Sequence, residues 1–248
     1  MTEHATMQTH AIDQLPTVDN ELDLMETLLP LDHRRIIELG CGNARTARDL
    51  LARHPGCTFA GLEVDTVQHA KNLQAAQPGM QFVAAGAQAI PFPDASFDVA
   101  LMLKSLHHVP MPDMAMALDE IARVLVPDGL LYVSEPIYDG ALNTLVRLYN
   151  DEGVVRAAAQ RALDDAIGGT TPKWEAVAER RFAVPVRFEN FDQFEQRMMR
   201  PSFADHRLDD ARVAAVREAY APHQGPDGAH FVRPTHVRLL RRTAAAGH

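Results

Sequence analysis

Residues 34–51, RRIIELGCGNARTARDLL, join a short apolar run to a glycine turn and then to a helical pattern. Such a turn between a strand and a helix commonly holds phosphate, because backbone N–H groups and the positive helix end favour an anion. Glu38 stands two residues before the first glycine of this turn. Its carboxylate would repel a phosphate, so we expect a ligand other than a dinucleotide.

Strand and helix patterns alternate from Arg35 onward, which predicts βαβ units, a parallel sheet and an α/β fold in one domain spanning 1–248. The alternation of strand and helix patterns ends after Glu135. Residues 139 to about 178 are predicted to be helical and to form a lid over the carboxyl edge of the sheet. Pro185 cannot donate a ladder hydrogen bond, so its strand is expected at the sheet edge. The expected strands are 35–39, 57–64, 80–85, 96–103, 130–136, 181–188 and 235–242; the expected helices outside the lid are 19–29, 44–53, 66–76, one from Pro112, 190–200 and 209–220.

The composition indicates which kinds of binding partner are unfavourable for this chain. The 248 residues include 24 Lys plus Arg against 33 Asp plus Glu, a net charge of −9, which disfavours binding to a nucleic-acid backbone. No apolar run is long enough for a membrane span, and the first residues lack a signal-peptide pattern, so a cytoplasmic location is expected. The first 18 residues are expected to be flexible. The positions of His206, His223, His230 and His236 show no ligand spacing, and no metal is expected.

Ligands of open α/β sheets lie beyond the carboxyl ends of the strands. By that rule, one edge of the sheet contains the glycine turn with Glu38, then Glu63, and then the segments GAQ, KSLHH and EP, which follow later strands. Glu63 lies 21 positions after Gly42, the offset of an acid that binds a ribose. Glu38 suits a cation such as an ammonium group. A nucleoside joined to an amino acid is S-adenosylmethionine.

Four motifs occur in order across residues 36–136: IIELGCGNAR, GLEVD, AIPFPDASFDVALMLKSLHHV and EIARVLVPDGLLYVSEP. By these motifs the chain resembles the class I S-adenosylmethionine-dependent methyltransferases, in particular the small-molecule branch that includes quinone-biosynthesis methyltransferases. The resemblance implies a Rossmann-like, doubly wound, seven-stranded sheet whose antiparallel last strand is inserted beside the fifth. It also implies methyl transfer to a small-molecule acceptor by in-line displacement.

The resemblance also implies where the cofactor binds. Glu63 would bind the ribose hydroxyls, and Val64 would cover the adenine. The family usually has an acid where this chain has Gly86, so either Gln88 supplies the missing acceptor or the cofactor binds more weakly. The remaining implied positions are Gly40, Cys41 and Gly42 at the methionyl part with Glu38 nearby, Ala87 at the adenine edge, and Leu103 and Lys104 near the ammonium.

A general base is needed only if the acceptor must lose a proton. His107, Tyr138 and Glu135 stand where a base could reach, with His107 the first candidate and Tyr138 the second. Two other functions stay open. A nicotinamide-dependent oxidoreductase would share the turn and the ribose acid but not Glu38, and no Tyr-x-x-x-Lys pair follows the fourth strand. The second is a non-catalytic partner subunit, because Gly86 replaces the acid that usually binds the adenine. A homodimer is also left open.

Overall fold

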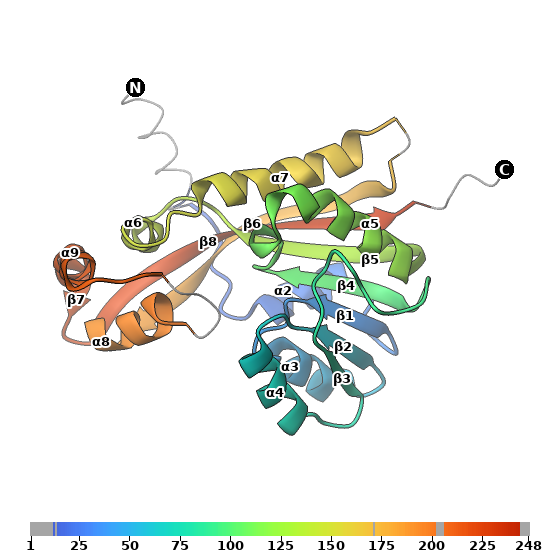
Figure 1. The fold of residues 1–248 in the computed structure, drawn as a ribbon, viewed down its shortest axis with the longest axis horizontal. Coiled ribbons are helices and arrows are strands. Elements are labelled where there is room, and N and C mark those ends of the chain that lie inside the picture. The colour runs from blue at the N-terminus through green and yellow to red at the C-terminus, as the bar shows by residue number, and fades with distance from the viewer. Residues whose placement is uncertain (1–11, 13, 171, 202–205, 244–248) are drawn as a thin grey trace. The chain divides into compact units, whose positions relative to one another are not determined.

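The computed structural model describes residues 12, 14–170, 172–201 and 206–243. Its sheet has the order β3-β2-β1-β4-β5-β8-β6, with β7 paired to β8 (Figure 1). The strands are β1 (Arg35–Leu39), β2 (Thr58–Leu62), β3 (Met80–Val83), β4 (Phe97–Leu103), β5 (Leu125–Pro136), β6 (Trp174–Phe188), β7 (Gln224–Gly225) and β8 (Gly228–Arg242).

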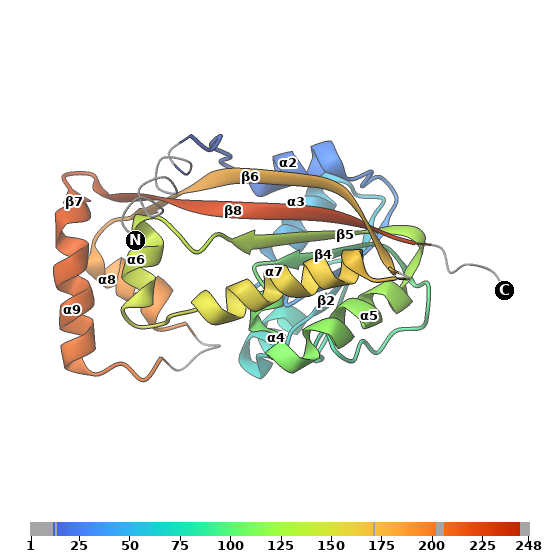
Figure 2. The ribbon, with the colours of Figure 1, turned by 90° about the horizontal axis from the view of Figure 1, so that it is seen from above.

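The first five strands pair in parallel, as expected from the alternating pattern. Ile37 of β1 lies opposite Ala60 of β2 and Ala100 of β4, and all three are buried. The last strand, β8, lies between β5 and β6 and runs antiparallel to β5 (Figure 2). The predicted insertion of the last strand beside the fifth is confirmed, as is the edge position of β6, the strand that contains Pro185.

The helices form where apolar stripes and capping residues coincide. Asp65 caps α4 by accepting from the backbone N–H groups of Val67 and Gln68, and Asp209 caps α9 by accepting from Arg212. Within the described residues no helix is both long and apolar enough to cross a bilayer. The helices are α2 (Glu21–Leu28), α3 (Arg45–Arg53), α4 (Thr66–Gln74), α5 (Met114–Val124), α6 (Ala141–Arg147), α7 (Gly153–Gly168), α8 (Phe191–Phe194) and α9 (Asp210–Tyr220).

The chain folds into two compact units. Unit 1 comprises residues 1–21, 136–154 and 181–236, and unit 2 comprises residues 22–135, 155–180 and 237–248. By these bounds, β6 and β8 each contribute residues to both units. The expectation that residues 1–248 form a single domain stays a prediction. The expected flexible segment at 1–18 falls largely outside the described residues.

Each unit has its own apolar core. In unit 2, α5 and α7 lie along one face of the sheet (Figure 2), and their Leu118 and Leu163 belong to the same buried cluster as Ile37. The core of unit 1 is aromatic: the Phe194 ring lies 5.1 Å from that of Phe188 and 5.2 Å from that of Tyr220, between ring centroids. The same cluster contains Leu142, Leu145 and Tyr149 from the expected lid.

Two expectations about elements are wrong in detail. Residues 139 to about 178 are not helical throughout, because α7 ends at Gly168 and β6 begins at Trp174. Gly168, Gly169 and Pro172 end the helix, since glycine is a poor helix former and proline cannot continue a helix. The strand expected at 130–136 begins earlier, at Leu125, and contains the PDG segment as an irregularity, with Asp128 at φ 63° and a register shift opposite Phe97 and Val99.

Candidate functional site

The glycine turn follows β1 and packs closely on the end of β4. Gly40 has φ 74°, and a Cβ at this position would lie 2.8 Å from the Cβ of Ser105. The Ser105 hydroxyl donates to the carbonyl of Leu39 over 2.6 Å. Both the left-handed backbone and the close approach therefore require glycine at position 40. Gly42 is also left-handed, at φ 50°, but a Cβ there would meet nothing within 4 Å.

Glu63 connects the end of β2 to the glycine turn. Its Oε2 accepts from the backbone N–H of Gly42 over 2.8 Å, and its Oε1 accepts from that of Asp65 over 2.9 Å. The residue is buried, whereas the neighbouring Val64 is 69% exposed. The 21-residue offset seen in the sequence thus corresponds to a direct contact. An exposed apolar side chain lies immediately beside the buried acid.

Asn72 supports the same turn from α4. Its side-chain amide donates to the carbonyl of Gly42 over 2.7 Å, and Gln68 donates to its oxygen over 2.9 Å. Asn72 is 2% exposed. Sequence reasoning missed this residue, because a single asparagine near the end of a helix carries no signal of its own. Ser105 belongs to the KSLHH segment, but the sequence pattern did not predict its contact with the turn.

The electrostatic environment of the turn is negative. Glu38 is buried at the end of β1, close to Cys41. Burial raises the pKa of the Cys41 thiol well above its usual range, and the charges of Glu38 and Glu63 raise it further. Two carboxylates that disfavour a thiolate also disfavour a phosphate and favour a cation at the same place.

The segment after β3 contains the position where the expected acid is missing. Ala87 is buried, and Gln88 is half-buried. The Gln88 side chain folds back over Gly86, because a Cβ on Gly86 would lie 2.5 Å from the Gln88 Oε1 atom. The Gln88 carboxamide therefore occupies the space that a side chain at position 86 would enter.

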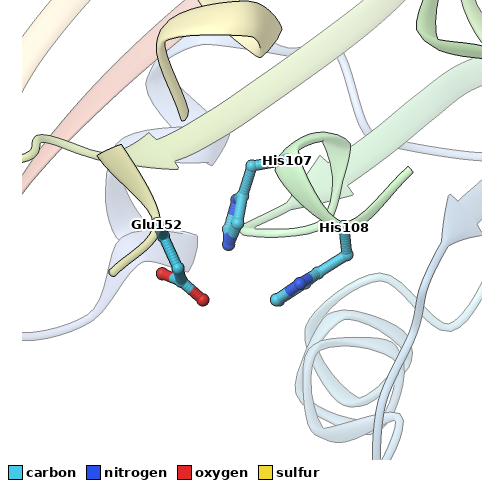
Figure 3. A group of neighbouring side chains, drawn as sticks. All are labelled: His107, His108 and Glu152. Carbon is cyan, nitrogen blue, oxygen red and sulfur yellow. The ribbon is translucent and has the colours of Figure 1, made fainter. Parts of the chain in front are cut away.

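The end of β4 leads into a short 3-10 turn, Leu106–His108. Leu103 and Lys104 are half-buried, and the Lys104 backbone has φ 61° while its N–H donates to Ser134 over 2.6 Å. The rings of His107 and His108 lie side by side with their centroids 4.1 Å apart (Figure 3). Glu152, the third side chain drawn there, belongs to unit 1.

A buried carboxylate holds His107. Glu135, at the end of β5, accepts from the backbone N–H of Leu106 through Oε1 over 2.9 Å. Its Oε2 is hydrogen-bonded to Nδ1 of His107. Glu135 is 2% exposed and His107 is 5% exposed. Two of the three candidate bases are thus bonded to each other.

Tyr138, the other catalytic candidate, belongs to unit 1. Its hydroxyl donates to Oδ1 of Asp151, which also accepts from the backbone N–H of Gly153 over 3.0 Å. The guanidinium of Arg147 lies 5.0 Å from the centre of the Tyr138 ring. Its catalytic role stays a prediction. His107 and all of the predicted cofactor positions lie in unit 2: Glu38, Gly40, Cys41, Gly42, Glu63, Val64, Ala87, Gln88, Leu103 and Lys104.

Residues 37–133 match a family described as a methyltransferase domain. They extend from β1 into β5 and include the glycine turn, Glu63, Gln88 and His107. This region therefore resembles a methyltransferase domain. It has the α/β fold expected from the sequence and contains most of the four motifs that carry the resemblance.

Curated relatives of this region include several proteins named as O-methyltransferases. O-methyltransferase rstn1 of Aspergillus nomiae is 33% identical over 123 residues, which are 47% of this chain and 53% of that protein. The fatty-acid O-methyltransferase of Mycolicibacterium smegmatis is 35% identical over 116 residues, 44% of this chain and 40% of that protein. A 2-methyl-6-phytyl-1,4-hydroquinone methyltransferase of Synechocystis is 31% identical over 102 residues, 40% of this chain and 31% of that protein. The alignments thus span about half or less of these relatives.

Solved structures resemble the chain over most of its length. The YcgJ protein of Bacillus subtilis superposes with a TM-score of 0.62 at 17% identity, covering 90% of this chain and 98% of that one. At this identity the likeness concerns the fold alone. It extends beyond residues 37–133 into the segments that follow β5.

Proposed function

We propose that this chain transfers a methyl group from S-adenosylmethionine to a small-molecule acceptor. The observation that carries the proposal is the pair of buried carboxylates, Glu38 and Glu63, on either side of the glycine turn of a region that resembles a methyltransferase domain. The methionyl part of the cofactor carries a sulfonium and an ammonium, and both favour this negative environment. The pyrophosphate of a nicotinamide dinucleotide would be repelled there.

The residues fit the parts of this cofactor. Each Glu63 oxygen accepts one backbone N–H and keeps a second lone-pair direction, so the carboxylate can also accept from ribose hydroxyls. The exposed side chain of Val64 offers an apolar surface to the adenine, and Gln88 offers an amide oxygen to its amino group. The other assigned positions are Gly40, Cys41, Gly42 and Glu38 for the methionyl part, Ala87 for the adenine edge, and Leu103 and Lys104 for the ammonium.

The bound cofactor supplies a methyl group on an already activated sulfonium, so the protein has little bond chemistry of its own to perform. Its residues align the acceptor for in-line displacement and exclude water. The relatives named as O-methyltransferases favour oxygen as the accepting atom.

Calorimetry with S-adenosylmethionine and with NADH tests the choice of cofactor. We expect the first to bind and the second not to bind. Incubation with S-adenosylmethionine and a panel of phenols, hydroquinones and fatty acids should then yield S-adenosylhomocysteine. Binding of NADH alone would favour the oxidoreductase. Failure to bind either ligand would favour a non-catalytic partner subunit.

We also propose a cytoplasmic location and no nucleic-acid partner. The net charge of −9 supports the second of these. A homodimer is compatible with the proposal. Analytical ultracentrifugation and a binding assay with duplex DNA at low salt would test the oligomeric state and the partner class.

A further inference from the structure

The contact between Glu135 and His107 joins two segments of unit 2 at the carboxyl ends of neighbouring strands. Glu135 ends β5, and His107 lies in the 3-10 turn after β4, the strand that pairs with β5 in parallel. A buried carboxylate is costly unless both of its oxygens are hydrogen-bonded. Here Oε1 accepts from the Leu106 backbone, and Oε2 is bonded to His107 Nδ1. The backbone bond to Oε1 fixes the carboxylate plane, which in turn fixes the imidazole.

This bonding determines which ring nitrogen carries the proton. An ionised carboxylate only accepts hydrogen bonds, so Nδ1 of His107 must donate. In a neutral imidazole, Nε2 then carries the lone pair and is the basic atom. A carboxylate behind a histidine therefore selects the tautomer in which Nε2 can receive a proton.

We propose that Glu135 is a positioning residue that holds His107 in the Nδ1–H form, and that His107 Nε2 takes the proton from a hydroxyl-bearing methyl acceptor. This inference rests on the proposed methyl transfer. As the acceptor O–H bond breaks, its proton passes to Nε2. The acceptor oxygen forms the new bond to the methyl carbon, and the sulfur–methyl bond breaks with its electron pair remaining on sulfur. The imidazolium formed faces the Glu135 carboxylate and afterwards releases its proton to water.

The same geometry narrows the acceptor class to phenol-like hydroxyls. A phenol with a pKa of about 10 is almost wholly protonated at neutral pH and gains from a base. A carboxylic acid with a pKa of about 4 is already ionised and needs none. We therefore expect hydroquinone to be a better acceptor than oleate.

The tautomer can be measured without any turnover. In protein labelled with 15N-histidine, long-range 1H–15N spectra should identify wild-type His107, when neutral, as protonated on Nδ1. In Glu135→Ala this preference should be lost, because no carboxylate then accepts from Nδ1. A wild-type His107 protonated on Nε2 would overturn the proposal whether or not the protein is a methyltransferase.

Kinetics with S-adenosylmethionine and hydroquinone test the proton transfer. His107→Gln should lower kcat about 100-fold or more, the range for losing a general base, and Glu135→Gln about 10- to 100-fold, the range for losing a carboxylate that orients a histidine. The cofactor Kd should stay unchanged in both. His108→Gln is the matched control, because His108 is the exposed neighbour with its ring 4.1 Å away, and it should retain the wild-type rate.

The pH profile separates a base from a structural role. The titratable groups that the described part of unit 2 places against His107 include Glu135 and His108. The activity of His107→Gln should rise with pH as the phenol ionises by itself, and the acidic limb of the profile should shift in Glu135→Gln but not in His108→Gln. An unshifted profile in Glu135→Gln, or full activity in His107→Gln, would overturn the inference. Wild-type protein that fails to bind S-adenosylmethionine would overturn the proposed function instead.

Discussion

At the scale of single residues, Glu63 has a structural role in the glycine turn and a proposed role in cofactor binding. It holds Gly42 and Asp65 by backbone hydrogen bonds, and we propose that it also binds the ribose. Glu63→Ala should weaken S-adenosylmethionine binding by about 1–3 kcal/mol, the range for losing a charged hydrogen-bonding partner. Calorimetry measures this, with Asp49→Ala as control, since Asp49 forms a solvent-exposed ion pair with Arg45 on α3. Unchanged affinity in Glu63→Ala would contradict the ribose assignment.

Gln88 and Gly86 form a second testable pair. Gln88→Ala should weaken the cofactor about 2- to 10-fold, corresponding to one neutral hydrogen bond of about 0.5–1.5 kcal/mol. Gly86 is not left-handed, so aspartate meets no backbone strain there, but its Cβ would lie 2.5 Å from the Gln88 Oε1 atom. The double variant Gly86→Asp with Gln88→Ala should therefore bind more tightly than Gln88→Ala alone. Equal affinities of the two variants would show that the adenine amino group lies elsewhere.

Few residue contacts could be predicted from the sequence. The spacing of Gly42 and Glu63 predicted a ribose-binding acid, but it did not predict the hydrogen bond between Glu63 and the Gly42 backbone. The pairing of Glu135 with His107 depends on the register of β4 against β5, which no local pattern specifies. Asn72 and Ser105 donate hydrogen bonds to backbone carbonyls of residues distant in the sequence. A backbone carbonyl is present at every residue, so no sequence pattern predicts these bonds.

At the scale of elements, the strand–turn–helix around the two glycines gives a matched pair of variants. Both Gly40 and Gly42 are left-handed, and alanine at either position should cost about 1–2 kcal/mol. Only Gly40→Ala also places a Cβ 2.8 Å from Ser105, and such overpacking adds about 1–3 kcal/mol. Chemical denaturation should find Gly40→Ala the less stable of the two. The reverse order would contradict the close packing of the turn on β4.

The junction of α2 and α3 should stabilise the fold in a pH-dependent way. His54 bonds to Asp32 over 2.7 Å and to Glu26 over 3.1 Å, and Arg53 pairs with Asp23 and Glu26 beside it. The hydrogen bond to Asp32, with a smaller contribution from Glu26, raises the pKa of His54 above its ordinary value. A raised pKa in the folded state stabilises it fully below about pH 6.5 and loses this effect as pH rises through the folded value.

His54→Gln should therefore lower the unfolding free energy more at pH 5.5 than at pH 9. Denaturation at both values measures the difference. His230→Gln, an exposed histidine of β8, serves as the control and should show no such dependence. A pH-independent loss in His54→Gln would mean that packing, not charge, explains its contribution.

The identity of most elements could be predicted, but their ends were less accurate. Apolar periodicity predicted strands β1 to β4 and helices α3, α4, α5 and α9 within a few residues, whereas β5 begins at Leu125, well before its predicted start at residue 130. The helical segment was predicted to reach about residue 178, but α7 ends at Gly168, although Gly168, Gly169 and Pro172 are stop signals in the sequence. The strand that follows it is mostly exposed at its start, so it lacks the apolar run by which strands are usually recognised.

At the scale of the whole molecule, the proposed cofactor site lies within unit 2. S-adenosylmethionine alone should slow amide exchange at residues 40–44 and 63–67 and leave the exchange at residues 188–220 of unit 1 unchanged. Binding stabilises the states that hold the ligand, so protection should follow the binding residues. Hydrogen exchange with mass spectrometry measures both regions at once. Equal protection of both would show that cofactor binding is not confined to unit 2.

The insertion of the last strand beside the fifth followed from the family resemblance, and the structure confirms it. The two separate cores could not be predicted in the same way. Unit 1 assembles its aromatic cluster from stretches around Leu142, Phe191 and Phe231, which are far apart in the sequence and individually resemble ordinary helices and strands.

The passage of the chain between the units has a consequence for synthesis on the ribosome. The chain changes unit five times, after residues 21, 135, 154, 180 and 236. Leu240, near the end of β8, belongs to the core of unit 2. In the sheet, β8 is hydrogen-bonded to β5 on the side away from β4. A nascent chain that has emerged only as far as β7 therefore has β5 as an open sheet edge, which can pair with other chains. We expect association through β5 to be most favourable at this stage of synthesis, before β8 is released.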